Sequence, residues 1–308
     1  MNTTLWRWLG AAGALLAILA PSAGAAAPRP ADLPKAPLTL KDFERRDFRV
    51  GRHRAFIILP KTPAADGSKP WVWFIPTLRD KYPNQWHDWL LERLLRAGFA
   101  IAGVDIGESW GNPKGRLMFS RFHTEIVKKY ALSPKACLFA EDRGGLMAYN
   151  WAAENVKNVK CIGAVYPVCK LTDGPFFARV YDLTGTGDDK KNEAAFKLQF
   201  KNHNPLDRLA PLAAAKIPLF HLHGGEDKLV PVYSHSAEML RRYIKLGGPM
   251  TLIVRRSNRH EAALEFFESS ELLNFFLAQA RPPKKTDSGP AAPKNALPPE
   301  KADPGKTK

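Results

Sequence analysis

Short, continuous apolar runs alternate with amphipathic stretches through most of the 308-residue chain. An unbroken apolar run bounded by turn residues predicts a strand covered on both faces, whereas apolar residues three and four apart predict a helix. The predicted strands are PWVWFIP (70–76), FAIAGVDI (99–106), ACLFA (136–140), VKCIGAVYPV (159–168), IPLFHLHG (217–224) and MTLIVRR (250–256). The predicted helices lie at 84–96, 119–130, 143–156, 190–201, 233–246 and 262–279.

Strands that alternate with helices at this spacing predict an α/β domain with a mostly parallel, twisted sheet and helices on both faces. Before the first buried strand, FRV (48–50) and RAFIILP (54–60) are joined by a short turn at Gly51. This pair predicts an antiparallel hairpin at the N-terminal end of the sheet. We expect the domain to cover residues 41–280.

The two ends of the chain differ from this domain. Residues 1–25 contain an apolar run of about twelve residues followed by an A-x-A site at 23–25, which predicts a cleaved signal peptide and a secreted or periplasmic protein. The run is too short to cross a bilayer, so we expect no membrane span. Residues 26–40 are rich in Pro and Ala and predict an extended linker, and 281–308 predict a disordered tail rich in Pro and Lys.

The formal net charge of +16 raises the question of a nucleic-acid partner. The excess is diffuse, and part of it lies in the tail, which has no aromatic residue. We therefore predict no specific nucleic-acid partner. We expect a small-molecule substrate or ligand and no cofactor. Of the three cysteines, Cys137 and Cys161 fall in predicted core strands, where a free thiol behaves as a small apolar group. The sequence leaves open whether one disulfide forms and which two of the three cysteines it would join.

Residues 136–156 combine a short strand, a turn of small residues and an immediate helix. The turn reads Ala140, Glu141, Asp142, Arg143, Gly144. Such a context is typical of the G-x-S-x-G nucleophile elbow, which presents a serine at the third position. Here the third position is Asp142, so the chemistry of the site depends on an aspartate.

Two further candidates follow predicted strands. In open parallel sheets, functional groups lie beyond the carboxyl ends of the strands. Asp227 follows IPLFHLHG and begins a D-x-x-V-P motif that ends at Pro231, and His260 follows MTLIVRR and precedes a helix. A histidine beside a carboxylate can take and return a proton while the carboxylate holds its tautomer.

With these motifs in this order, residues 45–280 resemble the α/β-hydrolase superfamily, in particular its prolyl-oligopeptidase-like and dienelactone-hydrolase-like members. The resemblance implies that fold and descent from a serine hydrolase of esters or related carbonyl substrates. It assigns the nucleophile position to Asp142, the acid to Asp227 and the base to His260. It also places residues 171–216 where this fold often inserts a lid, although the segment could equally be a packed excursion.

The sequence departs from the family pattern around the site. The HGGG-type oxyanion loop is absent after the third strand, where Pro76, Thr77 and Leu78 stand. Backbone N–H groups of Arg143 and of Thr77 or Leu78 are the expected oxyanion donors. The Arg143 side chain is a candidate for binding an anionic substrate or for pairing with a neighbouring carboxylate.

Three interpretations of Asp142 remain open. It could be a nucleophile, as in haloalkane dehalogenases and epoxide hydrolases, although these usually place Trp where Arg143 stands. It could mark a lost nucleophile in a non-catalytic binding protein, paired with His260. Alternatively, Ser109 in Gly107–Gly111, which matches G-x-S-x-G, could replace it. Asn112 and Pro113 follow, and because we expect no helix to start there, we expect no elbow at Ser109, only a ligand contact.

His221 and His223 lie two apart on one predicted strand, as metal ligands can. The H-x-H-x-D-H arrangement of a metal site is not completed, because Gly225 and Glu226 occupy the positions of its Asp and His. We therefore expect both histidines to be buried and hydrogen-bonded, and we expect no metal.

Overall fold

The computed structural model describes residues 39–64, 66–76 and 83–280. The predictions for the signal peptide at 1–25, for the tail at 281–308 and for Thr77 and Leu78 lie outside the described residues, as does all but the end of the linker at 26–40.

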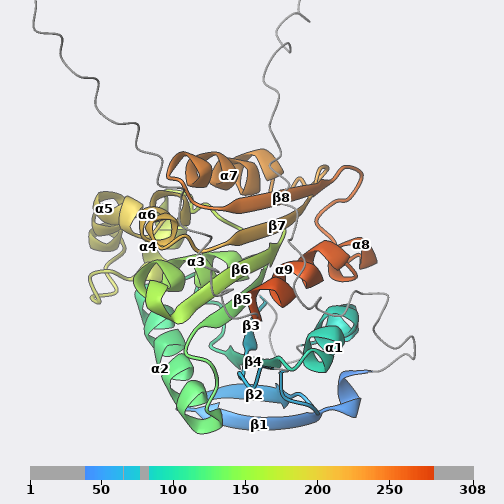
Figure 1. Ribbon diagram of the computed structural model, residues 1–308. Helices are drawn as coiled ribbons and strands as arrows, with labels where there is room; N and C mark the ends of the chain where they lie inside the picture. The colour runs from blue at the N-terminus through green and yellow to red at the C-terminus, as the bar shows by residue number, and fades with distance from the viewer. Residues whose placement is uncertain (1–38, 65, 77–82, 281–308) are drawn as a thin grey trace, which may run out of the picture. The chain divides into compact units, whose positions relative to one another are not determined.

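Eight strands form one sheet in the order β1-β2-β4-β3-β5-β6-β7-β8 (Figure 1). β1 pairs with β2 and β2 with β4 in antiparallel fashion, and every other neighbouring pair is parallel. This confirms the mostly parallel sheet with an N-terminal antiparallel hairpin. The strands are β1 (Glu44–Val50), β2 (His53–Leu59), β3 (Trp71–Ile75), β4 (Ala100–Asp105), β5 (Ala136–Glu141), β6 (Val159–Val165), β7 (Leu219–Gly224) and β8 (Met250–Arg255).

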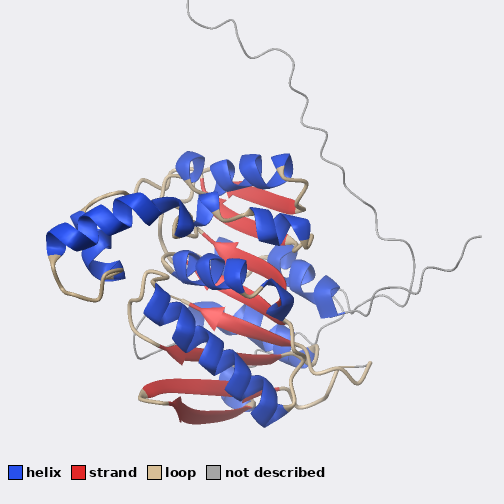
Figure 2. Ribbon diagram, turned by 90° about the vertical axis from the view of Figure 1, so that its left-hand side faces the viewer, coloured by secondary structure: helices blue, strands red, loops and turns tan. Residues whose placement is uncertain are grey.

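Helices cover both faces of this sheet (Figure 2). The pair α1 and α9 packs on one face, and the pair α2 and α3 packs on the other. The helices are α1 (Asp88–Arg96), α2 (Pro113–Tyr130), α3 (Gly144–Glu154), α4 (Pro175–Tyr181), α5 (Asp189–Gln199), α6 (Ala210–Ala214), α7 (Ser236–Lys245), α8 (Leu264–Phe267) and α9 (Ser270–Ala280).

The helices α4 and α6 were not predicted, and two predicted helices differ from the structure in their boundaries. A helix does start after Asn112, because the Asn112 side chain accepts a hydrogen bond from the Gly115 N–H at 2.7 Å and Pro113 occupies the first helical position, where its missing N–H costs nothing. The expected helix at 262–279 is divided into α8 and α9 at Ser269, whose hydroxyl accepts from the Leu272 N–H. Side-chain caps therefore set both boundaries.

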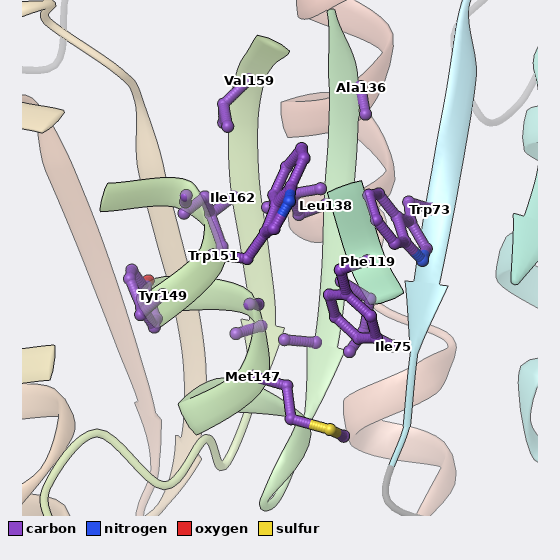
Figure 3. Close-up of a cluster of buried hydrophobic side chains, with 14 of the residues drawn as sticks. Trp73, Ile75, Phe119, Ala136, Leu138, Met147, Tyr149, Trp151, Val159 and Ile162 are labelled. Atoms are coloured by element: carbon purple, nitrogen blue, oxygen red, sulfur yellow. The ribbon is translucent and has the colours of Figure 1, made fainter. Parts of the chain in front are cut away.

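A large buried cluster of the described residues lies between α2, α3 and the sheet (Figure 3). The rings of Trp73 and Trp151 meet edge to face at 4.9 Å, and neither side chain is exposed. Burying a large apolar side chain contributes about 1.5–3 kcal/mol, so this cluster fixes α3 firmly against β3 and β5. The turn between β5 and α3 is consequently held at the sheet edge. Cys137 and Cys161 are buried in core strands, as predicted, and the described part of the chain contains no disulfide.

Candidate active site

The turn between β5 and α3 has the geometry of a nucleophile elbow. Asp142 stands at its apex with a φ of 49°, a left-handed conformation that non-glycine residues rarely adopt. A Cβ at Gly144 would lie 1.9 Å from the Ile75 carbonyl oxygen, so only glycine allows β3 to approach this closely. The Asp142 carbonyl accepts hydrogen bonds from the N–H groups of Gly145 and Val168, at 2.9 and 2.8 Å. These contacts hold the strained turn in place.

The structure brings together Asp142, Asp227 and His260. His260 Nδ1 lies 2.8 Å from Asp227 Oδ2, and His260 Nε2 lies 3.4 Å from Asp142 Oδ1. Asp227 is buried, and its other oxygen accepts from the backbone N–H groups of Leu229 and Val230. The Asp142 side chain is 23% exposed and that of His260 16%, so Asp142 is the most exposed of the three.

Two carboxylates flank the imidazole of His260. Burial by itself lowers the pKa of His260, but hydrogen bonds to Asp142 and Asp227 outweigh burial and leave that pKa above its ordinary value. The ring of Tyr166 packs against the imidazole at 4.6 Å between centroids. In this state the site therefore favours the protonated form of His260.

The guanidinium of Arg143 completes an ion-paired cluster on the solvent side. Its Nε lies 2.9 Å from Glu108 Oε2 and 3.5 Å from Asp142 Oδ2, and its Cζ lies 5.1 Å from the centre of the Trp110 ring. Arg143 thus pairs with Asp142 and with Glu108, a partner that the sequence did not indicate.

Ser109 does not stand on an elbow. Its side chain packs on the first turn of α2, where a Cβ at Gly115 would lie 2.4 Å from Ser109 Oγ, and its hydroxyl accepts from the Gly111 N–H. The expectation that this loop lacks elbow geometry was right, but the reason given, that no helix follows, was wrong. The loop reaches Arg143 through Glu108 and Trp110 instead.

Residues 171–216 form a helical excursion beside this loop. The Trp110 ring meets Phe176 and Phe177 of α4 edge to face, at 5.3 and 5.5 Å. α4 packs against α5, and both share a buried cluster with Leu146 of α3. Half of the Phe176 side chain stays exposed, which gives this side of the site an apolar rim.

Sequence reasoning missed a second polar group at the elbow. Glu141 Oε2 lies 3.0 Å from Nε2 of the buried His87, and its Oε1 accepts from the Tyr166 hydroxyl at 2.9 Å. Tyr166 directly follows β6, so the rule that selected Asp227 at a strand end could have found it. His87 precedes α1 and is 54 residues from Glu141 in sequence, so no local pattern indicated it.

His221 and His223 are buried and hydrogen-bonded, as expected. Among the residues that the structure describes, no group of three or more His, Cys, Asp or Glu side chains is arranged to hold a metal ion. In the same part of the chain, no helix has the length and apolar character of a membrane span.

No protein-family model matches the sequence. No curated protein matches it either. Solved structures do match. Puromycin hydrolase has a TM-score of 0.57 and 18% identity over 77% of this chain and 38% of its own. Est1E from Butyrivibrio proteoclasticus has a TM-score of 0.56 and 17% identity over 74% of this chain and 94% of its own.

The acylaminoacyl peptidase of Pyrococcus horikoshii has a TM-score of 0.54 and 16% identity over 77% of this chain and 41% of its own. The present chain therefore spans less than half the length of puromycin hydrolase and of the acylaminoacyl peptidase, and nearly all of Est1E. Together with the sheet order and the elbow, these similarities show that the chain has the α/β-hydrolase fold.

Proposed function

We propose that this protein is a hydrolase of small molecules in which Asp142 is the nucleophile and His260, oriented by Asp227, is the base. One observation carries the proposal. A carboxylate at the apex of the elbow lies 3.4 Å from one nitrogen of an imidazole, and the other nitrogen lies 2.8 Å from a buried carboxylate. Asp142 is thus placed to attack a substrate, and His260 is placed to activate the water that hydrolyses the covalent intermediate.

A carboxylate nucleophile favours a saturated carbon that bears a leaving group. An Asp142 oxygen would form a bond to that carbon while the bond to the leaving group breaks, and the leaving group takes the electron pair. A halide departs as the anion, whereas an epoxide oxygen stays attached and takes a proton from solvent. Attack on a carbonyl carbon would instead give a reactive anhydride. Alkyl halides and epoxides therefore suit Asp142 better than the carbonyl esters expected for a serine enzyme.

Formation of the ester on Asp142 prepares the site for hydrolysis of that ester. Esterification removes the negative charge of Asp142, one of the two carboxylates that raise the pKa of His260 against the effect of burial. The pKa of His260 then falls, and its neutral Nε2 can take a proton from water. The resulting hydroxide attacks the ester carbonyl, and the bond from that carbonyl carbon to the alkoxide oxygen breaks. The proton held by His260 passes to the alkoxide, so the alcohol leaves and Asp142 is restored. A positioned base of this kind contributes about 10²–10⁴ in rate.

Trapping of the ester tests the proposal. His260→Gln is incubated with an epoxide or a haloalkane, digested and mapped by mass spectrometry. We expect an alkyl adduct on the peptide that contains Asp142, and none in the matched control Asp142→Asn. Wild type is assayed on the same compounds and on p-nitrophenyl esters. Absence of both adduct and turnover across this panel would overturn the proposal.

A second candidate function is binding without turnover. The observation in its favour is that Asp142 lies between two cationic partners, His260 at one oxygen and Arg143 at the other. In a serine hydrolase that has lost its nucleophile, this ion-paired cluster would fill the site. Asp142→Ser should then gain p-nitrophenyl esterase activity, because Asp227 and His260 are in place. That gain, with no adduct on wild type, would favour this candidate.

A further inference from the structure

A buried chain of polar side chains extends from behind Asp227 into the core. The Tyr149 hydroxyl lies 2.6 Å from His221 Nε2, and His221 Nδ1 lies 2.8 Å from Ser236 Oγ. The same Ser236 oxygen lies 2.7 Å from His223 Nδ1. These four side chains come from α3, β7 and α7, and none is more than 1% exposed.

The active-site end of the chain is anchored on a backbone carbonyl. His223 Nε2 lies 2.7 Å from the Val230 carbonyl oxygen and 3.4 Å from Asp227 Oδ2. A carbonyl oxygen can only accept, so His223 must carry its proton on Nε2. The N–H of His223 is therefore directed at Val230 and at Asp227.

This anchor sets the direction of every other bond in the chain. A neutral imidazole with a proton on Nε2 has a lone pair on Nδ1, so the Ser236 hydroxyl must donate to His223. Since a hydroxyl has one proton, His221 must donate to Ser236 from its own Nδ1. His221 Nε2 then accepts from the Tyr149 hydroxyl. The two histidines are consequently in opposite tautomers.

The environment keeps the chain neutral. Burial, with a smaller effect of His223, lowers the pKa of His221 to about 3. Burial also lowers the pKa of His223 and raises that of Tyr149 well above its usual value. At neutral pH no member carries a charge, so the single pattern of donors and acceptors persists.

We propose that His223 is a positioning residue for Asp227 and, through Asp227, for His260. Oδ1 of Asp227 accepts from two backbone N–H groups, and Oδ2 accepts from His260 Nδ1 and faces His223 Nε2. With donors at both oxygens the carboxylate cannot rotate and acts only as an acceptor. His260 is thereby held with its Nδ1–H toward Asp227 and its Nε2 toward Asp142. Only the catalytic consequence rests on the proposed function.

Histidine ¹⁵N NMR of the full chain tests the proposal without substrate. At neutral pH we expect His223 with its proton on Nε2 and His221 with its proton on Nδ1. His260 is then titrated in wild type, His223→Leu and His223→Gln. Among the described residues, the charged and titratable groups that act on His260 include Asp142, Asp227, Tyr166 and His223.

Loss of the His223 N–H leaves Asp227 a stronger acceptor for His260. In His223→Leu we therefore expect the His260 titration midpoint to rise by about half a pH unit. Glutamine retains an N–H donor and an acceptor, so His223→Gln should restore the midpoint toward wild type. Where the leucine variant does not fold, His223→Asn, whose amide is too short to reach both partners, should give the same rise.

Tyr149→Phe is the matched control. It also removes a buried hydrogen bond from the chain, but at the far end, and Val230 still sets the tautomer of His223. We expect its His260 midpoint to equal that of wild type. Either of two results would overturn the proposal: an unchanged midpoint in a folded His223→Leu or His223→Asn, or His221 with its proton on Nε2. Neither depends on turnover, so failure of the proposed hydrolase activity leaves the test intact.

Discussion

Replacement of Asp142 by asparagine removes one charge from the site and preserves its shape. Asparagine is isosteric with aspartate and is among the residues that best tolerate the φ of 49° found here, so we expect the elbow to form. The change leaves Asp227 in contact with His260 and deprives both His260 and Arg143 of a carboxylate.

The structure gives the size of the effect on His260. An opposite charge within hydrogen-bonding range raises a histidine pKa by about 1–3 units, and here the 3.4 Å pair is partly exposed, which favours the lower end. We therefore expect the pKa of His260 to fall by about 1 unit in Asp142→Asn. Burial is the largest single influence on this pKa and lowers it, and in the variant only Asp227 remains to oppose burial.

The same shift changes stability in a defined pH window. A raised pKa in the folded state stabilises that state at pH below 6.5, and this stabilisation is lost as pH rises through the folded pKa. Asp142→Asn should thus lose about 1.4 kcal/mol at pH 5.5 and almost nothing at pH 9. NMR titration of His260 and urea unfolding at both pH values measure the two effects. An unmoved midpoint, or equal destabilisation at both pH values, would refute the reasoning.

Two further predictions concern stability. In Gly144→Ala, a Cβ 1.9 Å from the Ile75 carbonyl must displace backbone, so urea unfolding should show a loss of about 3 kcal/mol. Gly174→Ala is its control, because nothing lies within 4 Å of that Cβ. Since Gly174 is the N-cap of α4, where Ala is less favourable than Gly, the control should lose at most about 1 kcal/mol. Burial lowers the pKa of His221 to about 3 in the folded protein. The unfolded chain therefore binds a proton that the folded protein does not as pH falls below 6.5. The free energy of unfolding should be lower by about 3 kcal/mol at pH 4. Urea unfolding followed by circular dichroism from pH 7 to pH 4 checks this, and a flat profile would contradict it.

The strands and the three site residues Asp142, Asp227 and His260 could be predicted from the sequence for the same physical reason. A strand covered on both faces must be apolar throughout, so each core strand is visible as a continuous run, and its carboxyl end is visible as the first polar residues after that run. Asp142 and Asp227 follow buried strands of this kind, and His260 follows the edge strand β8, whose residues are only partly buried or exposed. The parallel arrangement that the pattern predicts brings these ends to one edge.

Other features could not be predicted from the sequence, because they depend on single hydrogen bonds or on residues far away in the chain. The start of α2 depends on one hydrogen bond from the Gly115 N–H to the Asn112 side chain. The hydrophobic pattern does not indicate this hydrogen bond. The pair of His221 and His223 is visible in sequence as a metal-like motif. Its hydrogen bonds to Ser236, from a different element, give it another role.

By itself, the sequence determined the fold class, the position of the elbow and the order of the three groups at strand ends, because burial imposes these patterns locally. Only the tertiary structure decided what each group contacts. It placed Asp142 between His260 and Arg143, and it placed a neutral histidine chain behind Asp227. Such contacts join residues far apart in the chain, and their direction depends on where a single carbonyl oxygen lies.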